Sequence, residues 1–365
     1  MKILVATLGH SADDDRVYHK QIRSLLREGH QVTLATRNQP VINTGPPGFQ
    51  HVDYGTAGVV QFGVALQSLA EQWQPQALQI HEFELLVVGG RIKQKWGIPL
   101  IYDVQDPHQE MWAAFSSKPP VIKQIIIWGL LRFEKLHLKH VDWVCALSPT
   151  IAQRYSDWGL KIMYVPNYPP LIPLEKTTPR EQVVIYQGQI SPERGIWQVI
   201  QAFQMVIEQV PTAKLNIYGS ERMPGLINQV KEKINSLGLD QAVVIKPEIS
   251  YEGILRRLQE VQIGLIPFTN KPLFRVLPPN KLYEYMMCGC AVVASDLPIL
   301  RELGKDCVLY VTPGDAEALA TAIVTLLTNA ERRKKLAVMG RELVESTYHW
   351  EQVEPDYLRI YEELV

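Results

Sequence analysis

The sequence predicts an α/β protein with two doubly wound domains, each built on a mainly parallel sheet. Three observations support this prediction. Short β-branched runs alternate with amphipathic helical stretches, the alternation stops at a proline-rich segment near the middle of the chain, and it then starts again. At 365 residues the chain is long enough to bury a separate core in each half. We expect the two domains to face each other across a cleft.

Six strands are predicted in the first half. They are the runs KILVAT, QVTLAT, ALQI, PLIY, WVCAL and IMYV. A helix is predicted directly after the first strand, over DDRVYHKQIRSLLREGH, where Gly29 ends it. One face of this helix carries the apolar residues Val17, Tyr18, Ile22, Leu25 and Leu26. Strands that alternate with such helices form a parallel sheet covered on both faces.

The second half repeats this architecture after a linker. Five prolines lie between residues 166 and 179, where they stiffen the chain. The strands predicted beyond the linker are VVIYQG, KLNIYG, VVIK, IGLIP, AVVAS and VLYV. We place the N-terminal domain at 1–168, the linker at 169–181, the C-terminal domain at 182–345 and a final helix at 346–365. The apolar stripe of this final helix needs a partner surface, and it consists of Trp350, Val353, Tyr357, Tyr361 and Leu364.

The composition excludes several classes of protein. Lys and Arg number 37 against 38 Asp and Glu, so we do not expect a partner that is a nucleic acid. No run reaches the roughly 18 apolar residues of a membrane span. The apolar run in MKILVATLGH is too short for a signal peptide, so we expect a cytoplasmic location. The cysteines lack a zinc spacing and are expected to be buried free thiols; they are Cys145, Cys288, Cys290 and Cys307.

Ligands bind beyond the carboxyl ends of the strands in open parallel sheets. The loops at those ends are Gly9, 81–84, 103–110, Gly188 onward, Gly219, Pro247 onward and 267–280. After the first strand of the C-terminal domain, Gly188 allows a ligand to approach the backbone, and Arg194 stands at the start of the next helix. A guanidinium beside the positive end of a helix suits a diphosphate, whereas a solvated arginine in an ordinary turn is the alternative.

The stretch PPNKLYEYMMCGCAVVAS raises a question about Glu284. Asn280 is a good N-cap, so Lys281 and Glu284 are expected in the first helical turn or just after it. A carboxylate in that position can interact with the helix dipole. It can also accept two hydrogen bonds from a ribose diol at the mouth of the sheet, and the spacing alone leaves both interpretations open.

Several segments together resemble the retaining nucleotide-sugar glycosyltransferases of family 4. They are YQGQISPERGIWQVIQAF, LNIYGS, IGLIPF, NKLYEYMMCGCAVVASDLPILREL and WEQVEPDYLRIYEEL, with DDDRVYHKQIRSLLREGHQVTLAT and IYDVQDPHQEMW in the N-terminal half. The resemblance covers nearly the whole chain, and the order and spacing of the segments make it specific. It implies two Rossmann-like domains of the B-type glycosyltransferase fold (GT-B), with no metal and no cofactor. It also implies that the final helix returns to the N-terminal domain.

The resemblance implies roles for individual residues. Glu284 is assigned to the ribose hydroxyls of the donor, Arg194 to its diphosphate and Gly188 to close approach of the phosphates. The Pro247–Tyr251 segment is expected to frame the base, and Gly9 to bring the N-terminal loop close to the transferred sugar. The expected donor-binding residues are Gly9, Gly188, Gln189, Arg194, Tyr218, Gly219, Pro247, Ile249, Leu277, Asn280, Lys281 and Glu284. The catalytic candidates are Arg194, Gln105, Asp106 and His81.

The sequence departs from the family pattern in several places. Family members usually carry another glutamate eight residues before Glu284, where this chain has Val276. The glycine-rich loop that follows is replaced by Leu-Pro-Pro at 277–279, which removes two backbone donors. A second basic residue near the diphosphate falls on Gln189, and a histidine near the reacting sugar is replaced by Gln105. The residues expected to compensate are Asn280 and Lys281.

Two further segments have competing interpretations. Asp13 and Asp15 form a D-x-D, which we interpret as helix capping rather than as a metal site, because it directly precedes an amphipathic helix. Residues 121–140 are strongly apolar, with interspersed lysines and an arginine. They form either a helix that covers the sheet, which we favour, or an interfacial helix that contacts anionic lipid at the inner face of a membrane.

The sequence supports one leading function and two alternatives. The leading hypothesis is retaining transfer of a hexose from a nucleotide-diphospho-sugar, with UDP-glucose or a similar UDP-hexose as donor, to a glycan or lipid-linked acceptor in polysaccharide biosynthesis. A nucleotide-sugar 2-epimerase shares this architecture and needs no acceptor. A non-catalytic subunit that binds a sugar nucleotide is the third hypothesis, because Val276, Gln189 and Gln105 replace residues that the family uses.

Overall fold

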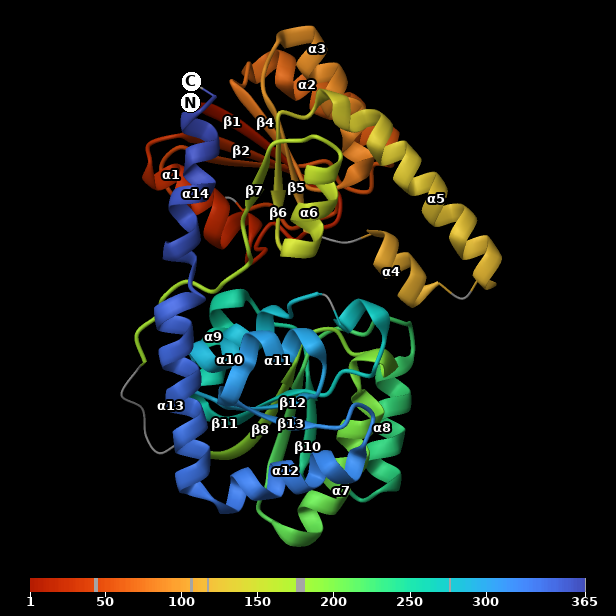
Figure 1. Ribbon diagram of the computed structural model, residues 1–365, viewed down its shortest axis with the longest axis vertical. Coiled ribbons are helices and arrows are strands. Elements are labelled where there is room, and N and C mark those ends of the chain that lie inside the picture. The colour runs from red at the N-terminus through yellow and green to blue at the C-terminus, as the bar shows by residue number, and fades with distance from the viewer. Residues whose placement is uncertain (43–44, 106–107, 117, 175–180, 276, 365) are drawn as a thin grey trace. The chain divides into compact units, whose positions relative to one another are not determined.

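The computed structural model describes residues 1–42, 45–105, 108–116, 118–174, 181–275 and 277–364. The chain forms two compact units (Figure 1). One contains Met1–Asn167 together with Glu351–Val365, and the other contains Tyr168–Trp350. Each unit has its own parallel sheet with helices packed on it, which confirms the prediction of two doubly wound α/β domains.

The sheet of the N-terminal unit has the strand order β3-β2-β1-β4-β5-β6-β7, and the neighbouring strands are parallel. The strands are β1 (Lys2–Ala6), β2 (Gln31–Thr36), β3 (Phe49–Asp53), β4 (Ala77–Ile80), β5 (Leu100–Val104), β6 (Trp143–Ala146) and β7 (Ile162–Tyr164). The six predicted strands are confirmed, and β3 is an additional strand that the sequence did not reveal. It is an edge strand with one buried residue, so it lacks the continuous apolar run of a buried parallel strand. The order reverses between β1 and β4, which places the switch point of this sheet there.

The sheet of the C-terminal unit has the order β10-β9-β8-β11-β12-β13, again with parallel neighbours. Its strands are β8 (Glu181–Gln187), β9 (Lys214–Tyr218), β10 (Val243–Lys246), β11 (Val261–Ile266), β12 (Ala291–Ser295) and β13 (Val308–Val311). All six are confirmed predictions. The order reverses between β8 and β11, so the loops that follow these two strands lie at the switch point.

The helices of the N-terminal unit begin with a wider turn than the sequence suggests. They are α1 (Arg23–Arg27), α2 (Val59–Trp73), α3 (Leu86–Trp96), α4 (His108–Phe115), α5 (Pro120–His137), α6 (Pro149–Asp157) and α14 (Trp350–Glu362). The predicted first helix is a π-helix over Val17–Ile22 that continues into α1, and it ends before Gly29 (φ 77°) as expected. The π-helical stretch buries polar as well as apolar side chains.

The capping prediction for Asp13 and Asp15 is wrong. Asp14 is the residue whose carboxylate accepts from the first backbone N–H groups, at 2.9 Å from each nitrogen. Asp13 instead pairs with His19 at 2.6 Å, and Asp15 pairs with Lys20 at 3.0 Å. The spacing could not separate the three neighbouring carboxylates, because each lies within one turn of the helix start.

Amphipathic helices enclose the core of the C-terminal unit. They are α7 (Ile196–Gln209), α8 (Leu226–Ser236), α9 (Tyr251–Glu260), α10 (Asn280–Met287), α11 (Pro298–Gly304), α12 (Ala316–Thr328) and α13 (Ala330–Thr347). The apolar face of α7 lies in the core with α8 and α12; it includes Ile196, Val199, Ile200 and Phe203, and Ile207 is partly buried beside it. The four cysteines are buried and free, which confirms that prediction.

The start of α10 differs from the expected one. Pro279 precedes the helix and Asn280 is its first residue, so Asn280 is not the N-cap. Proline fixes φ near the helical value and needs no amide donor, which suits it to a helix start. Lys281 is the second helical residue and Glu284 the fifth, and both side chains are buried.

The final helix, α14, groups with the N-terminal unit from Glu351 onward. Its buried stripe includes Trp350, Val353, Tyr357 and Tyr361, whereas Leu364 lies beyond the helix end and is partly exposed. The hydroxyls of Tyr357 and Tyr361 both donate to Gln79 Oε1 of β4, the first at 2.9 Å. The partner surface that the stripe requires is therefore the N-terminal sheet and its helices.

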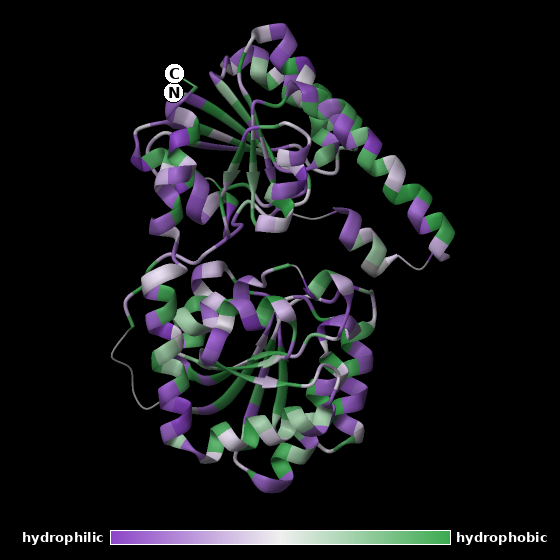
Figure 2. Ribbon diagram, viewed as in Figure 1, coloured by the Kyte–Doolittle hydropathy of each residue, from purple (hydrophilic) through white to green (hydrophobic). Residues whose placement is uncertain are grey.

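The helix α5 projects from the N-terminal unit, and the expectation that it covers the sheet is wrong for most of its length (Figure 1). None of residues 120–133 is buried, and its apolar residues Ile125 and Trp128 are 63% and 65% exposed. Apolar and polar residues alternate along it in Figure 2. Its C-terminal end is held by Glu134, whose carboxylate accepts from Tyr102 at 3.0 Å and from Gln109 at 3.0 Å. No helix among the described residues is long and apolar enough to cross a membrane.

Candidate functional site

Two glycine turns meet at the carboxyl edge of the C-terminal sheet. β8 ends at Gln187 and is followed by Gly188 (φ 99°), and β9 ends at Tyr218 and is followed by Gly219 (φ 156°). The N–H of Gly188 donates to the carbonyl of Tyr218 at 2.9 Å. A Cβ on Gly219 would lie 2.0 Å from the carbonyl oxygen of Gly188, so a side chain cannot be added there without moving backbone. The two turns therefore pack closely at the switch point, where Gly188 is half-buried and Gly219 is buried.

Arg194 and Lys281 face the missing side chain of Gly188. A Cβ built on that glycine would lie 3.8 Å from Arg194 Nη1 and 3.6 Å from Lys281 Nζ. Arg194 ends the 3₁₀ turn Pro192–Arg194, which Ser191 caps by accepting from the Arg194 N–H. The predicted placement of Arg194 beside the glycine turn, just before α7, is what the structure shows.

Lys281 is the more buried of these two cations, with 6% of the residue exposed. Its Nζ donates to the carbonyl of Gln187 at 2.6 Å and lies 4.8 Å from the ring centroid of Tyr186 and 5.2 Å from that of Phe268. Burial lowers the pKa of Lys281 well below its ordinary value, and the nearby Arg194 lowers it further. Two cations this close in a buried setting favour an anion between them.

Glu284 lies beyond the first turn of α10, where a carboxylate would interact with the helix dipole. The first turn of α10 carries no acidic residue, so the interpretation of Glu284 as a dipole partner does not fit. Gln187 Nε2 donates to Glu284 Oε2. Gln187 Oε1 is buried and has no hydrogen-bond partner among the described residues. The two side chains thus present oxygen acceptors to a ligand that carries hydroxyls.

The loop after β10 is open to solvent. Residues 247–250 are exposed, including the candidates Pro247 and Ile249, and Ser250 caps α9 by accepting from the Gly253 N–H at 3.2 Å. Tyr218 is buried, with Lys246 Nζ at 5.2 Å from its ring centroid. An exposed loop beside a buried aromatic ring can accept a planar group through its backbone.

Residues 277–280 connect this edge to α10. The N–H of Leu277 donates to the carbonyl of Leu273 at 3.1 Å, and the rings of Phe268 and Phe274 stack at 4.3 Å. Leu277 and Asn280 are both half-buried. Val276, where the family carries its other glutamate, lies outside the described residues.

At the switch point of the N-terminal sheet, Glu82 organises the loop that contains Gly9. Its carboxylate accepts from the hydroxyl of Thr7 at 2.6 Å and from the N–H groups of Leu8 and Gly9, each at 2.9 Å. Gly9 itself is exposed. Three donors fix this carboxylate, so its evident role is to hold the loop in shape.

His81 is buried in a polar network rather than exposed at the strand end. It is 1% exposed; its Nε2 lies 3.0 Å from Gln79 Nε2, and its Nδ1 lies 2.8 Å from Gln105 Nε2 and 3.3 Å from Asp103. Gln105 is half-buried at the end of β5. His81 can position Gln105, but it has little surface with which to touch a substrate. The catalytic candidate Asp106 lies outside the described residues.

Asp103 is the anchor of this network. Arg16 donates to both of its oxygens, at 2.9 and 2.6 Å, and Gln21 donates at 2.7 Å. Burial alone would raise the pKa of Asp103, but the Arg16 guanidinium and His81 hold it well below the usual range. Because Gln79 also receives the two tyrosine hydroxyls of α14, the same network ties the returning helix to the end of β4.

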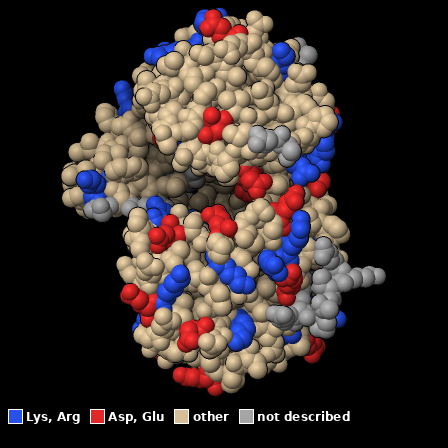
Figure 3. Space-filling model, turned by 180° about the vertical axis from the view of Figure 1, so that it is seen from behind, with Lys and Arg blue, Asp and Glu red and all other residues tan. Residues whose placement is uncertain are grey.

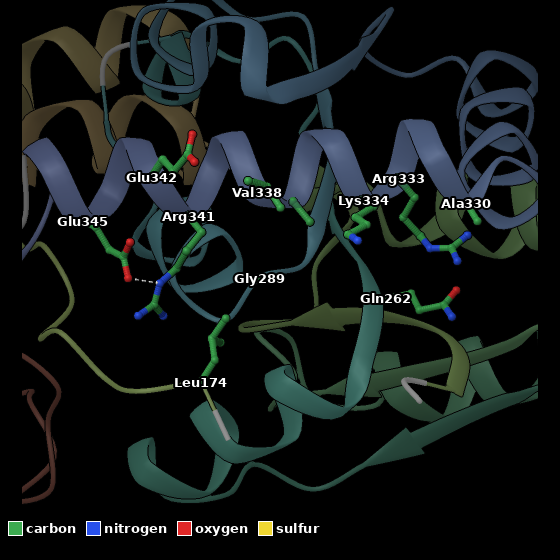
Figure 4. Close-up of a pocket in the computed structure, with 11 residues that line it drawn as sticks. Leu174, Gln262, Gly289, Ala330, Arg333, Lys334, Val338, Arg341, Glu342 and Glu345 are labelled. Atoms are coloured by element: carbon green, nitrogen blue, oxygen red, sulfur yellow. Dashed lines mark hydrogen bonds and ion pairs between the residues drawn. The ribbon is translucent and has the colours of Figure 1, made fainter. Parts of the chain in front are cut away.

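A cavity of the C-terminal unit lies elsewhere. It has about 800 Å³ and runs along α13, with Leu174, Gln262 and Gly289 opposite (Figure 4). Gln262 and Gly289 stand at the amino ends of β11 and β12, so this cavity is at the opposite edge of the sheet from the glycine turns. Arg341 is paired there with Glu345 at 2.6 Å. Neither its place nor its groups suit the predicted donor site.

The two doubly wound units are those of a protein of the GT-B type, and the C-terminal unit carries Arg194 and Lys281 beside its glycine turns. Residues 15–168 match the family model of the glycosyl transferase 4-like domain, and residues 181–329 match that of glycosyl transferases group 1. The chain therefore belongs to glycosyltransferase family 4 and is a hexosyltransferase, as the sequence resemblance predicted.

Known proteins support this assignment. The chain is 27% identical over 331 residues to a phosphatidyl-myo-inositol mannosyltransferase of Mycobacterium leprae, covering 84% of this chain and 80% of the relative. Its fold is similar to that of sucrose-phosphate synthase from Thermosynechococcus elongatus, with a TM-score of 0.76, 18% identity, and coverage of 99% and 98%. It is also similar to Anabaena HepE in complex with UDP-glucose, with a TM-score of 0.76, 16% identity and full coverage of both chains.

The sequence did not reveal two polar residues beside the glycine turns, Gln187 and Arg222. Gln187 ends a strand, so the sequence pattern does not distinguish it from the other residues of the sheet. Arg222 lies in the loop after Gly219, and its Nη1 is 3.5 Å from Gln189 Oε1. A basic residue within a few positions of a strand-end glycine was the available signal for Arg222.

Proposed function

We propose that this enzyme transfers a hexose with retention of configuration from a UDP-sugar, UDP-glucose or a similar UDP-hexose, to a glycan or lipid-linked acceptor in polysaccharide biosynthesis. The observation that carries the proposal is the convergence of Arg194 and Lys281 on the side of Gly188 where a Cβ would lie. Two cations beside a glycine turn at a switch point suit a diphosphate. The similarity to HepE, whose structure contains UDP-glucose, supports the choice of base and sugar.

The donor binds along the carboxyl edge of the C-terminal sheet in this proposal. Glu284 accepts hydrogen bonds from the ribose hydroxyls, with Gln187 Oε1 as a neighbouring acceptor, and the 247–251 loop borders the base. Arg194 and Lys281 neutralise the diphosphate. The base, the phosphates and the sugar contact the remaining candidate residues of the same edge in this proposal. These residues are Tyr218, Gly219, Ile249, Leu277 and Asn280.

The transfer step needs charge stabilisation more than a protein base. The bond from the anomeric carbon to the diphosphate oxygen breaks, the acceptor oxygen forms a new bond on the same face, and the acceptor proton passes to the departing diphosphate. Arg194 and Lys281 stabilise the negative charge that builds up on that group. In the N-terminal unit, the loop that contains Gly9 and the side chain of Gln105 position the sugar and the acceptor. Glu82 holds the Gly9 loop in place, and His81 holds Gln105.

A donor screen tests the proposal directly. UDP- and GDP-linked glucose and mannose are titrated calorimetrically, and the preferred donor is then incubated with glycan and lipid acceptors. We expect a UDP-hexose to bind most tightly and the product to have the anomeric configuration of the donor. Preference for a GDP-sugar would overturn the choice of nucleotide. Formation of a C2 epimer from donor alone would indicate an epimerase, and binding without turnover with any acceptor would indicate a non-catalytic subunit.

We also propose that the enzyme is cytoplasmic and contacts the inner face of a membrane through residues 121–140. The support is the exposed apolar surface of α5, with Ile125 and Trp128, among the cations Lys123 and Arg132. Such a helix can bury its apolar residues in the lipid interface while its cations meet anionic headgroups. Sedimentation with vesicles tests this: anionic vesicles should retain the protein, neutral ones should retain less, and Trp128→Ser should weaken both. Equal retention of the parent and Trp128→Ser proteins would refute the proposal.

A further inference from the structure

The loop after β9 carries a third cation to the glycine turns. The N–H of Arg222 donates to the carbonyl of Ile190 at 3.1 Å, and the N–H of Ile190 donates to the carbonyl of Ser220 at 2.8 Å. A parallel bridge pairs Ile190 with Glu221. Arg222 is thereby fixed by its backbone beside the loop that follows Gly188.

The same loop is tied on its other side to the start of α8. The carboxylate of Glu221 accepts from the N–H of Gly225 at 3.0 Å and from the N–H of Ile227 at 2.8 Å. The main chain of Arg222 therefore has restraints on both sides, and the guanidinium projects from a fixed base.

The Arg222 guanidinium lies near one carboxylate, Glu193, and one other cation, Arg194. Its Nη1 is 3.5 Å from Gln189 Oε1, which is a long contact to a neutral group. Burial lowers the pKa of Arg222, Glu193 acts to raise it, and Arg194 lowers it again. Arg222 and Arg194 are therefore close enough to repel each other.

This edge of the sheet has an excess of positive groups. Arg194, Arg222 and Lys281 share it with the two carboxylates Glu193 and Glu284. Of these carboxylates, Glu284 already accepts from Gln187. Repulsion between partly buried cations destabilises them, and a multiply charged anion that binds between them offsets this repulsion.

We infer that Arg222 binds the diphosphate of the donor together with Arg194. Its guanidinium takes the place of the second basic residue of the family, which is the neutral Gln189 in this chain. The inference rests on the proposed function, since the ligand is the diphosphate of a nucleoside diphosphate or its sugar. A guanidinium can donate two parallel hydrogen bonds to phosphoryl oxygens, which an amide at position 189 cannot match. Arg222 is thus a donor-binding residue outside the segments that carry the family resemblance.

The test compares two probes and four proteins. Affinities for UDP and for inorganic pyrophosphate are measured at one ionic strength with the parent, Arg222→Gln, the double variant Arg222→Gln with Gln189→Arg, and Arg257→Gln. Arg257 is the matched control because it is an exposed arginine of the same unit, paired with Glu260 at 2.7 Å. Arg222→Gln should weaken both probes by about 10- to 30-fold, the size of one lost charged hydrogen-bonding group.

The double variant is the most specific arm. Because Gln189 Oε1 and Arg222 Nη1 are neighbours, an arginine at 189 can place its charge in the same space, and both affinities should return to within about threefold of the parent. Arg257→Gln should stay within about twofold, as expected for an exposed ion pair. Thermal unfolding of each variant should match the parent.

Four outcomes overturn the inference. If the parent and Arg222→Gln bound both probes with equal affinity, Arg222 would not bind the diphosphate. The proposed function would then remain intact. Loss of UDP affinity without loss of pyrophosphate affinity would place Arg222 against the nucleoside. A lowered unfolding midpoint without rescue by Gln189→Arg would make its role structural. A parent protein that binds neither probe would remove the proposed function and this inference together.

Discussion

Replacing Lys281 by methionine should affect donor binding and stability in opposite directions. The lysine is buried, its Nζ donates to the carbonyl of Gln187 at 2.6 Å, and it lies between the rings of Tyr186 and Phe268. Methionine has a similar length and suits an aromatic environment. The change therefore removes the charge while it keeps most of the packing.

The size of each effect follows from the setting of the ammonium group. Its pKa is lowered by burial and by Arg194, so at pH values between the folded and unfolded pKa the unfolded chain binds more protons. Stability of the parent should rise with pH across that window, which ends near the ordinary pKa of lysine. Removing the group costs one hydrogen bond, about 1 kcal/mol, but also removes a desolvated charge, so we expect a net gain of about 1–3 kcal/mol at neutral pH.

Donor binding should change the other way. Loss of one charged contact to the diphosphate corresponds to about 1.5–3 kcal/mol, or roughly 10- to 150-fold in affinity. Because the diphosphate raises the depressed pKa of Lys281, binding at a pH between the pKa values of the free and the bound protein should take up protons. The measured enthalpy at that pH should then depend on the ionisation enthalpy of the buffer. Calorimetry with UDP in two buffers and thermal unfolding from neutral to alkaline pH measure both effects.

The reasoning would be refuted by either of two results. If Lys281→Met bound UDP as tightly as the parent, the lysine would not face the diphosphate. If the variant were less stable than the parent at neutral pH and showed the same increase of stability with pH, Lys281 would not be the group that titrates. Arg257→Gln, which removes an exposed paired cation, is the control for general effects of charge.

Three further predictions concern other residues. Glu284→Gln should weaken UDP at least about tenfold, leave a 2′,3′-dideoxy analogue unchanged and barely move the unfolding midpoint, since an amide can still bond with Gln187; equal losses for both nucleotides would make Glu284 structural. Arg194→Ala should raise the barrier of transfer by about 2–4 kcal/mol, and turnover at the parent rate would contradict the phosphate assignment. Asp103→Asn leaves Arg16 without its buried partner and should cost about 3–5 kcal/mol in denaturant unfolding while UDP affinity is unchanged; a loss below 1 kcal/mol would contradict the anchoring role.

The sequence predicted the residues around the Gly188 turn of the C-terminal unit more fully than their surroundings. Gly188, Arg194, Lys281 and Glu284 stand in segments where a strand, a turn and a helix follow one another at short range, and local spacing then determines which side chains meet. The cap of α10 was misplaced by one residue because proline before asparagine offers two plausible helix starts. Arg222 comes from a different strand end, and its proximity to Gln189 depends on the pairing of two loops, which spacing does not encode.

The surroundings of the polar residues at the strand ends of the N-terminal unit were less predictable, for a physical reason. Whether a carboxylate or imidazole at a strand end faces solvent or the interior depends on partners far away in the chain. His81 reads as a candidate for catalysis, yet its ring nitrogens meet Gln79 and Gln105. Asp103 reads as part of a polar loop, yet Arg16, 87 residues away, holds it. The exposure of α5 was likewise hidden, because an apolar helix that covers a sheet and one that meets lipid have similar compositions.

These buried partnerships bear on the chemistry itself. At the switch point of the N-terminal sheet, the carboxylate of Glu82 is occupied by Thr7, Leu8 and Gly9, and that of Asp103 by Arg16 and Gln21. The carboxylate of Glu82 thus shapes the loop that contains Gly9. The Arg16 guanidinium and His81 hold the pKa of Asp103 well below its usual range, so Asp103 is a poor proton acceptor. In the function proposed above, Arg194 and Lys281 of the C-terminal unit favour a diphosphate as it gains negative charge. That proposal therefore sends the acceptor proton to the departing diphosphate.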